Sequence, residues 1–593
     1  MITIIYFFIF ISETDFNQVE LIMIKIKELL SHGVMPSQLP PCFSSTSFGK
    51  KHNVITKQIT LLPELTSKKC AAIRPELFSV ARIGHSRRLT SIVNPITQYY
   101  LSRVIAQNWK SLQKHYAKSS LSLSKPEIVE GGSRSIAFTP IRELQEKKVI
   151  DSAGYKYALI SDISQFFPTI YTHTIGWALD GKEIAKPKQY AKNLHLNDLG
   201  ILLDKRVGHC QSSQTIGVPV GPDTSHILAE IIGVAIDLEL EKKLTQKPAG
   251  FRFVDDYYLF FHTKDAAEDA LAKLSNSMSY FELKINSVKT KIIPIDDLSE
   301  ETWKYSLQQF KFESSRKKQK NSINHYFDLA FRMAKLHLDE NVMVYAIKRL
   351  KGEIVKKKNW KLFEAYLCKV LLMYPNTIQD ISHLLITYKL YDYIEDKSPL
   401  ARTLNQLILG HALLEHHSEI AWALWLSREL KIKLEHGACV AVNNISSSVC
   451  LILAYDLQLN GLLETNIDQT KFQNFLDPKE LWRTNWLLAY EAGIRDWMGT
   501  TKASILADPY FGVLAKYGVN FYDNKMTLQP IFSPKTILPD LDSDELINDE
   551  FFFLEETDDY TGLEVTLLDE LIEELDEPVE HTTFEDFEDD IPF

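Results

Sequence analysis

The sequence of 593 residues lacks the features of several protein classes. Glycine and proline are scarce, with 23 residues each, which excludes a collagenous or low-complexity chain. The six cysteines are scattered without a C-x-x-C pair, so the sequence signals neither a zinc ribbon nor a disulfide framework. We therefore expect a reducing, cytoplasmic setting. Since 45% of the residues are hydrophobic, the length predicts about three to five folded units.

The start of the chain lacks the length of a membrane span and the charge of a signal peptide. The apolar run within residues 1–12 has about ten residues, whereas a bilayer span needs roughly 20, and no basic segment precedes it. An ordinary amphipathic helix pattern begins at Met23. We treat residues 1–22 as an uncertain leader, because translation could begin at Met1 or at Met23, and we expect no membrane partner.

Basic residues are absent from the end of the chain. Residues 540–593 contain 23 Asp or Glu and no Lys or Arg, which leaves 54 acids against 66 bases in residues 1–539, a net charge of +12. A basic body suits a polyanionic partner such as nucleic acid. The acidic tail also contains Phe and Leu, so two interpretations stay open. It folds onto the basic body or a basic partner, or it is a disordered solubilising segment.

The hydrophobic pattern changes once along the body of the chain. Residues 157–295 alternate strand-like apolar runs with helical stretches, which predicts an α+β core. Residues 324–497 carry apolar residues at i, i+3 and i+4 over long segments, which predicts an all-helical half, either a bundle or an α-solenoid. Three prolines between residues 530 and 539 mark a linker before the acidic tail.

Three carboxylates fall at the ends of strand-like runs. Asp255 and Asp256 are adjacent within the run at residues 253–261, and Asp162 follows an earlier run at residues 157–161. Taken alone, an Asp-Asp pair is more typical of a solvated turn. Carboxylates that converge from two strands, however, suit two Mg²⁺ ions that clamp the attacking and departing oxygens of phosphoryl transfer.

Two further segments accompany these carboxylates. Residues 217–221 read Gly-Val-Pro-Val-Gly and open an apolar helix, and glycines there let the backbone approach a ligand closely. Residues 283–291 form a segment that ends with lysines at the change from a helix to a strand. In this order, the four segments resemble motifs A, B, C and D of the palm of reverse transcriptases. Phe-Val-Asp-Asp stands in place of Tyr-x-Asp-Asp, and Gly-Val-Pro-Val-Gly in place of Gly-x-Pro-Gln-Gly.

The resemblance implies a fold of the α+β class, with a right-hand polymerase palm and fingers of reverse transcriptase type. It covers about residues 80–300. The helical half that follows resembles the general plan of bacterial defence-associated and abortive-infection reverse transcriptases. We expect an N-terminal region with the fingers at residues 23–155, the palm at 156–300, a thumb-like and α-helical domain at 301–535, and the acidic tail at 536–593.

The resemblance also implies roles for the carboxylates and for one lysine. Asp162 and Asp255 would bind two Mg²⁺ ions directly, or Mn²⁺ in their place, with the Ile163 carbonyl as a further ligand and Asp256 close by. Lys289 matches the motif D lysine that can protonate the leaving pyrophosphate. A plain surface lysine is the alternative for this position.

The nucleotide site follows from the same resemblance. Arg88, with Arg87 beside it, matches the basic residue of the fingers that meets the triphosphate. Phe167 matches the steric gate against a 2′-hydroxyl and so favours dNTPs, while a core phenylalanine is the alternative. The floor beneath the incoming nucleotide and template would be shaped by Gly217, Pro219 and Gly221. Val220 replaces the usual Gln and cannot hydrogen-bond, which puts the template grip in doubt and leaves poorly templated or protein-primed synthesis open.

Other sites are sparse in the sequence. No ribonuclease H set follows residue 300, and no H-E-x-x-H zinc pattern exists. We expect His416 and His417 on a solvated helix surface. One basic run is either a strip that binds the nucleic-acid backbone next to the thumb or an ordinary solvated loop. Its cationic residues are Arg316, Lys317, Lys318 and Lys320.

These features predict an RNA-directed DNA polymerase that uses dNTPs and an RNA template to make a DNA product. The resemblance implies a role in bacterial antiviral defence, with a dedicated non-coding RNA and a partner protein or homo-oligomer left open. A group II intron maturase is disfavoured because no recognisable DNA-binding or endonuclease domain follows. A non-catalytic nucleic-acid-binding scaffold is the contrasting alternative, although it has no need to confine three carboxylates near a polyanion.

Overall fold

The structure is a computed structural model that describes residues 13–84, 86–139, 141–189, 198–298, 302–313, 315–338 and 340–532. The acidic tail predicted at residues 536–593 and the first twelve residues of the leader lie outside this range. Helix α1 (Glu13–Ser31) runs through Met23 without a break. Among the described residues, no helix combines the length and the apolar character needed to cross a bilayer. The domain boundaries expected above stay predictions.

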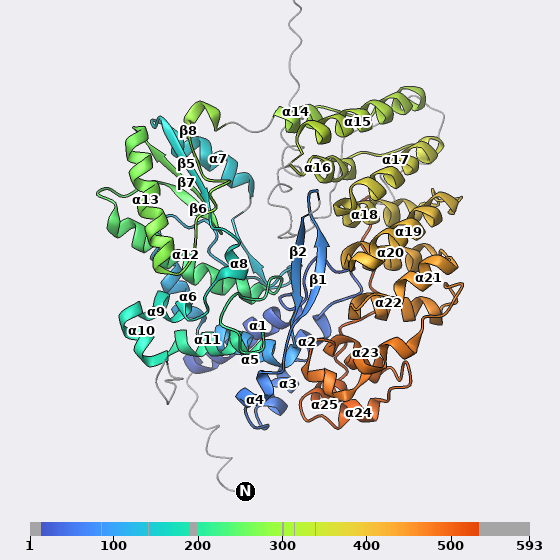
Figure 1. Ribbon diagram of the computed structural model, residues 1–593, viewed down its shortest axis with the longest axis horizontal. Coiled ribbons are helices and arrows are strands. Elements are labelled where there is room, and N and C mark those ends of the chain that lie inside the picture. The colour runs from blue at the N-terminus through green and yellow to red at the C-terminus, as the bar shows by residue number, and fades with distance from the viewer. Residues whose placement is uncertain are drawn as a thin grey trace, which may run out of the picture.

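A four-stranded antiparallel sheet forms the centre of the α+β half (Figure 1). Its strands are β6 (Ala249–Phe253), β7 (Asp256–Phe261), β5 (Tyr157–Asp162) and β8 (Lys291–Pro294), in that spatial order. The register pairs Leu159 with Leu259 and Asp162 with Asp256. The last residue of β5 and the first residue of β7 therefore lie side by side at one edge of the sheet.

Both faces of the sheet are buried, which explains why its strands are apolar almost throughout. Leu159 and Leu259 belong to the large core that includes α13 (Lys264–Tyr280), whereas Ala158 and Phe260 pack with Leu144 of α7 (Ile141–Ser152). Successive residues of a strand point to opposite faces. The period of two thus assigns each strand residue either to the α13 side or to the α7 side.

The remaining elements of this half lie around the sheet. The hairpin β1 (Glu76–Ala81) and β2 (Arg87–Ile92) stands between the sheet and the helical half (Figure 1). The other elements are α2 (Thr46–Lys50), α3 (His52–Ile59), α4 (Ser67–Cys70), α5 (Pro95–Gln107), α6 (Trp109–Tyr116), β3 (Glu127–Ile128), β4 (Ile136–Ala137), α8 (Phe166–Thr169), α9 (Thr174–Asp180), α10 (Lys182–Gln189), α11 (Leu199–His209) and α12 (Asp223–Lys243).

The second half is helical, as the period of 3.6 predicts, and contains no strand among its described residues. Each helix from α15 to α20 packs against the helix two places further on, which is the arrangement of stacked helix pairs in an α-solenoid and not that of a simple bundle (Figure 1). The helices are α14 (Thr302–Gln308), α15 (Arg316–Leu336), α16 (Val342–Arg349), α17 (Trp360–Met373), α18 (Ile378–Lys389), α19 (Ser398–His411), α20 (His417–Leu430), α21 (His436–Val442), α22 (Ser448–Leu459), α23 (Trp486–Ile494), α24 (Lys502–Leu506) and α25 (Phe511–Lys516).

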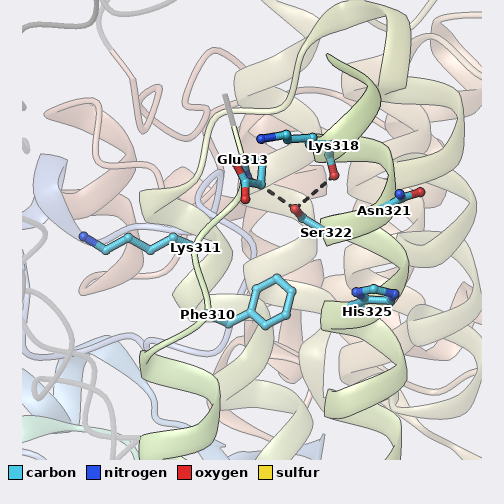
Figure 2. Close-up of a pocket in the computed structure, with 7 residues that line it drawn as sticks. All are labelled: Phe310, Lys311, Glu313, Lys318, Asn321, Ser322 and His325. Carbon is cyan, nitrogen blue, oxygen red and sulfur yellow. Dashed lines mark hydrogen bonds between the residues drawn. The ribbon is translucent and has the colours of Figure 1, made fainter. Parts of the chain in front are cut away.

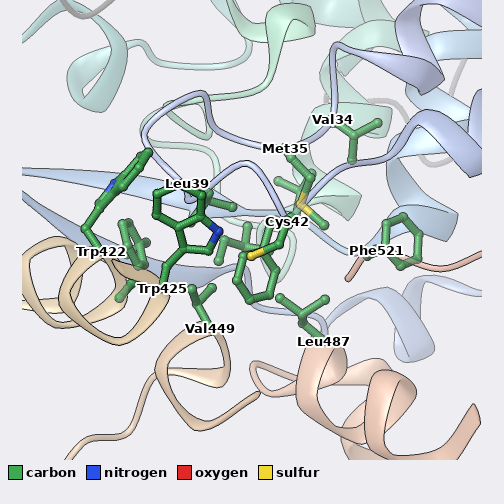
Figure 3. Packing of buried hydrophobic residues seen from close by; sticks show 14 of the residues in the cluster. Val34, Met35, Leu39, Cys42, Trp422, Trp425, Val449, Leu487 and Phe521 are labelled. Atoms are coloured by element: carbon green, nitrogen blue, oxygen red, sulfur yellow. The ribbon is translucent and has the colours of Figure 1, made fainter. Parts of the chain in front are cut away.

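The N-terminal segment packs directly on the helical half. Figure 3 shows side chains from residues 34–42 next to Trp422 and Trp425 of α20 and to Phe521. The indole nitrogen of Trp422 donates to the Gln38 carbonyl at 2.9 Å, and the Asp523 amide donates to the Cys42 carbonyl at 2.7 Å. One continuous hydrophobic core therefore joins the beginning of the described chain to its end.

One local prediction is wrong. His417 is buried, with 8% exposure, and His416 is half-buried, whereas the sequence suggested a solvated helix surface. His417 Nδ1 accepts from the Ser79 amide at 3.2 Å, and its Nε2 bonds Glu415 at 2.8 Å. The periodicity of α20 could not predict this, because the distant strand β1 covers His417 and His416 packs against His411 at the end of α19.

Candidate active site

The three predicted carboxylates meet at one edge of the sheet. Asp162 ends β5, Asp256 begins β7 directly opposite, and Asp255 lies in the tight turn between β6 and β7. The Ile163 amide donates to the Asp255 carbonyl at 3.2 Å, which ties the chain after β5 to this turn. Ordinary antiparallel pairing is therefore sufficient to bring the carboxylates together from two distant segments.

The turn that carries Asp255 is strained, and buried hydrogen-bond partners hold its backbone in place. Val254 has φ of 52°, a left-handed conformation that is costly for a β-branched residue. Its amide donates to Ser124 Oγ at 2.8 Å, and its carbonyl accepts from the Arg252 guanidinium at 2.8 Å. Both backbone polar groups of Val254 are thus fixed by buried partners.

The guanidinium of Arg252 is fully buried and paired with two acids of α12. It contacts Glu230 at 2.9 Å and Asp237 at 2.9 Å. Gly233 lies between these acids on the helix, and a side chain there would meet the Arg252 guanidinium at 2.7 Å. No sequence pattern indicated this network, which anchors the turn of Asp255 to α12, the longest helix of the α+β half.

The carboxylates repel one another. Burial, and then the nearby charge of Asp162, raises the pKa of Asp255 to about 6, while burial and the charge of Asp255 raise the pKa of Asp256 to about 7. Lys289 Nζ lies 2.5 Å from the Asp162 carboxylate. Burial disfavours the ammonium of Lys289, but its hydrogen bond to Asp162 and the acidic charges raise its pKa overall. Lys289 therefore offsets only part of the negative charge of the three carboxylates.

Two more cations face this cluster. The charge of Arg88 opposes the rise in the pKa of Asp255 that burial causes, and the charge of Lys148 acts in the same way on Asp256. Lys148 Nζ also lies 4.5 Å from the centre of the Tyr258 ring. No sequence pattern pointed to Lys148, because its helix α7 precedes β5 and only the sheet packing brings it near.

Arg87 and Arg88 point in different directions, as neighbours on a strand must. The Arg87 guanidinium donates to both oxygens of Glu419 of α20, at 2.7 and 2.8 Å, and to Ser79. Arg88 lies on the side of the carboxylates. A contact of Arg87 with a triphosphate stays a prediction, and in this structure its guanidinium is engaged by the helical half.

The loop at residues 217–221 lies between the four-stranded sheet and the β1–β2 hairpin. Gly217 has φ of 82°, and a side chain there would meet the Pro168 carbonyl at 2.9 Å. The Val220 carbonyl accepts from the Ser91 amide of β2 at 2.6 Å, and the Pro219 carbonyl accepts from Ser225 Oγ at 2.5 Å. Gly221 also has a positive φ, of 124°. Glycines are thus required where the loop bends, and the loop joins β2 to the site.

Phe167 stands beside this loop. Its carbonyl accepts from the Val218 amide at 2.9 Å, and its ring packs edge-on against His226, with centroids 4.7 Å apart. The preceding Phe166 is buried in the core, whereas Phe167 is only half-buried. The structure therefore gives the core role to Phe166, and the steric-gate role of Phe167 stays a prediction.

The basic run is helical and is not a solvated loop. Its four cations lie in the first turns of α15 and are exposed, around a buried Gln319 whose side chain accepts from the Lys356 amide at 2.9 Å. This bond brings a second run of three lysines, residues 356–358, next to the first. We call the two runs together the α15 basic patch; its residues are Arg316, Lys317, Lys318, Lys320, Lys356, Lys357 and Lys358.

An open pocket of about 340 Å³ adjoins this patch (Figure 2). Lys318 and Glu313 lie at one end, and Phe310 and His325 form the other. Ser322 Oγ connects the walls, since it accepts from the Glu313 amide at 3.4 Å and donates to the Lys318 carbonyl at 3.1 Å. The pocket lies on α15, apart from the carboxylates of the sheet.

One family model matches part of this chain. Residues 91–321 match the family model described as reverse transcriptase (RNA-dependent DNA polymerase). A search of curated proteins finds no significant match. Among solved structures, a telomerase from Candida albicans in complex with a fragment of telomeric RNA has 12% sequence identity and a TM-score of 0.25, over 65% of this chain and 69% of that chain. A TM-score this low does not establish a common fold.

The matched range contains the three carboxylates, Lys289 and the loop at residues 217–221, and it ends within α15. A domain of this kind implies an RNA template and nucleotide substrates, and polymerases of this family typically use divalent metal ions. The chain therefore carries a reverse transcriptase domain, which indicates an RNA-directed DNA polymerase, a nucleotidyltransferase.

Proposed function

We propose that this protein makes DNA on an RNA template with Asp162, Asp255 and Asp256 as its catalytic carboxylates. The observation that carries the proposal is the register of the sheet, which sets Asp162 opposite Asp256 and next to Asp255. Burial of three carboxylates this close together raises the pKa values of Asp255 and Asp256 and so disfavours their charged forms. Such a cluster suits a site that handles cations and phosphates.

The carboxylates fit a pair of Mg²⁺ ions. Hard oxygen ligands are the donors that Mg²⁺ prefers, and the raised pKa values of Asp255 and Asp256 reflect repulsion that bound cations would relieve. Asp162, Asp255 and Asp256 would hold the ions, together with the Ile163 carbonyl. When bound, the ions supply activation of the attacking hydroxyl and stabilisation of the departing oxygen.

The chain's own side chains would orient the nucleotide. Arg88 lies on the carboxylate side of β2 and would bind the triphosphate, as an arginine fork suits phosphate oxygens. Phe167 would exclude a 2′-hydroxyl and so select dNTPs. Lys289, which is 64% exposed and within reach of Asp162, would give a proton to the departing pyrophosphate.

The biological setting that we propose is antiviral defence in bacteria, with a dedicated non-coding RNA as template or partner. The support for it is the order of a polymerase domain followed by a helical solenoid, and the basic charge of the body. Val220 lacks a hydrogen-bonding side chain, so we include synthesis that starts from a protein hydroxyl or is weakly templated.

The test is incorporation of labelled dNTPs by the purified full-length protein with Mg²⁺ and its co-purified RNA. Asp255→Asn/Asp256→Asn keeps the side-chain shape and removes the charge, and we expect incorporation to fall at least about 10³-fold, because stabilisation of developing charge commonly supplies this much. Asp265→Asn on the exposed face of α13 is the matched control and should retain activity. Equal activity of both variants would contradict the proposal and favour a binding scaffold.

A further inference from the structure

A second cluster of metal-binding side chains lies far along the chain from the carboxylates. His411 is the last residue of α19, His416 precedes α20, and Glu419 lies in the first turn of α20. Between the histidines the chain makes a tight connection in which Glu415 has φ of 53°. This connection brings three donor atoms together within 4.8 Å of one another.

The distances within this cluster fit a small transition metal. The two Nδ1 atoms are 2.8 Å apart, and Glu419 Oε1 is 3.7 Å from His411 Nδ1 and 3.6 Å from His416 Nδ1. A point equidistant from these three atoms in their plane lies about 2.0 Å from each, which is the usual length of Zn–N and Zn–O bonds. No side chain would need to move far to coordinate an ion.

Hydrogen bonds hold the Glu419 carboxylate in place. Glu419 Oε2 accepts from Arg87 at 2.8 Å and from Ser418 Oγ at 2.6 Å, while Oε1 accepts from Arg87 at 2.7 Å. Oε1 is also the atom that faces the two imidazoles. Arg87 thus fixes the carboxylate in the way that outer hydrogen bonds orient metal ligands.

The two rings and their surroundings suit a neutral, accessible donor pair. Burial lowers the pKa of both histidines and so favours neutral rings. One Nδ1 donates to the other at 2.8 Å, so coordination through both Nδ1 atoms requires the donor ring to change to the tautomer protonated on Nε2. Their side chains keep 19% and 22% exposure, which leaves a path for an ion and a water ligand. His417 is excluded as a ligand because Ser79 and Glu415 occupy both of its nitrogens.

We propose that His411, His416 and Glu419 form a Zn²⁺ site with a water as the fourth ligand. Two histidines and one glutamate around an open fourth position are an established zinc ligand set. The ion would close the connection between α19 and α20 directly behind β2, where Glu419 also holds Arg87. The site is independent of the polymerase activity proposed above.

The test measures metal content and coordination in the full-length protein without an affinity tag. Zinc is counted by mass spectrometry after dialysis against metal-free buffer, and Co²⁺ is then exchanged in to report tetrahedral geometry through its visible absorption. We expect about one ion per chain and a tetrahedral spectrum in the wild type. His411→Gln and, separately, His416→Gln should each weaken Co²⁺ binding at least about tenfold.

Controls separate this site from the carboxylates and from loss of folding. His436→Gln alters an exposed histidine of α21, and Asp255→Asn/Asp256→Asn disables the other cation site; both should keep the Co²⁺ spectrum. Circular dichroism verifies that each variant is folded. The proposal is overturned if the folded wild type binds no ion, which would mean that the histidines share only a proton, or if either histidine variant keeps wild-type binding. Loss of the spectrum only in the aspartate variant overturns it as well.

Discussion

At the scale of single residues, the position of Asp255 depends on a buried serine. Ser124 accepts the amide of Val254, which is held in a left-handed conformation. We predict that Ser124→Ala lowers the turnover of dNTP incorporation by about ten- to a hundredfold, because small misplacements of catalytic groups have effects of this size. The free energy of unfolding should fall by about 1–3 kcal/mol, since a buried donor loses its partner.

The matched control for this change is Ser122→Ala in the same segment. Ser122 Oγ donates to Glu230 at 2.5 Å but does not contact Val254. The control should therefore cost stability without a comparable loss of turnover. If both variants lower turnover equally, the clamp on Val254 is not what positions Asp255.

A residue of the helical half should make stability depend on pH. Burial raises the pKa of Glu364 from its usual 4.5 to about 7, and one of its carboxylate oxygens has no hydrogen-bond partner among the described residues. The folded state thus holds a proton that the unfolded state releases, so this group's contribution is fully present below pH 4.5 and is lost as pH rises through 7.

We predict that Glu364→Gln raises the free energy of unfolding by about 3 kcal/mol at pH 8 and by less than about 1 kcal/mol at pH 5. Urea denaturation at the two pH values measures the difference. Glu268→Gln, on an exposed position of α13, should show no such pH dependence. An equal effect of Glu364→Gln at both pH values would mean that Glu364 is already ionised at pH 5.

At the scale of elements, the strand geometry of β2 divides two adjacent arginines between two tasks. Arg88 faces the carboxylates and Arg87 faces α20. The same reasoning applies to α15, whose first turns carry the cations of the α15 basic patch while Gln319 between them is buried. The buried Gln319 side chain anchors α15, while the charged side chains around it stay exposed.

We predict that Lys317→Ala/Lys318→Ala/Lys320→Ala weakens RNA binding and makes it less salt-dependent. Each lost phosphate contact should reduce the slope of log affinity against log salt by about 0.7–0.9, so the triple variant should lose about 2 units of slope. Binding is measured by fluorescence anisotropy over a salt series.

A second triple variant tests whether position matters beyond charge. Lys50→Ala/Lys51→Ala/Lys57→Ala removes the same charge from exposed positions on α2, α3 and the residue between them, at the opposite end of the molecule in Figure 1. We expect its slope to stay near that of the wild type. Identical slopes for the two triple variants would assign the effect to net charge and not to the α15 basic patch.

At the scale of the whole molecule, the two halves share one core. Trp425 is fully buried where the N-terminal segment meets α20 (Figure 3). We predict that Trp425→Ala lowers the free energy of unfolding by about 3–5 kcal/mol, because it leaves a large cavity. Hydrogen exchange should then speed up together in residues 34–42 and in α20.

The comparison for this prediction is Leu413→Ala, a large-to-small change at a side chain with 77% exposure in the same half. It should leave stability and exchange unchanged. If Trp425→Ala speeds exchange in α20 but leaves residues 34–42 protected, then residues 34–42 are stabilised by the rest of the α+β half and not by the shared core.

The chemistry expected of the site and the class of each half could be inferred from the sequence alone. Asp162, Asp255 and Asp256 could be located because strand periodicity and the order of the four motifs are local properties of the chain. The helical half could be recognised because a period of 3.6 survives without knowledge of neighbours. Whether that half was a bundle or a solenoid could not be read, since stacking depends on which helices meet.

Which polar groups meet across long stretches of chain depends on tertiary packing. Ser124 bonds the Val254 amide from a distant part of the chain, the charge of Lys148 on α7 acts on Asp256, and the Arg87–Glu419 pair spans the two halves. His417 was misassigned for the same reason, because strand β1 covers it, and His416 contacts His411 of α19. Periodicity reports which face of an element is apolar, whereas the partner of a buried charge is set by packing between segments that are distant in sequence.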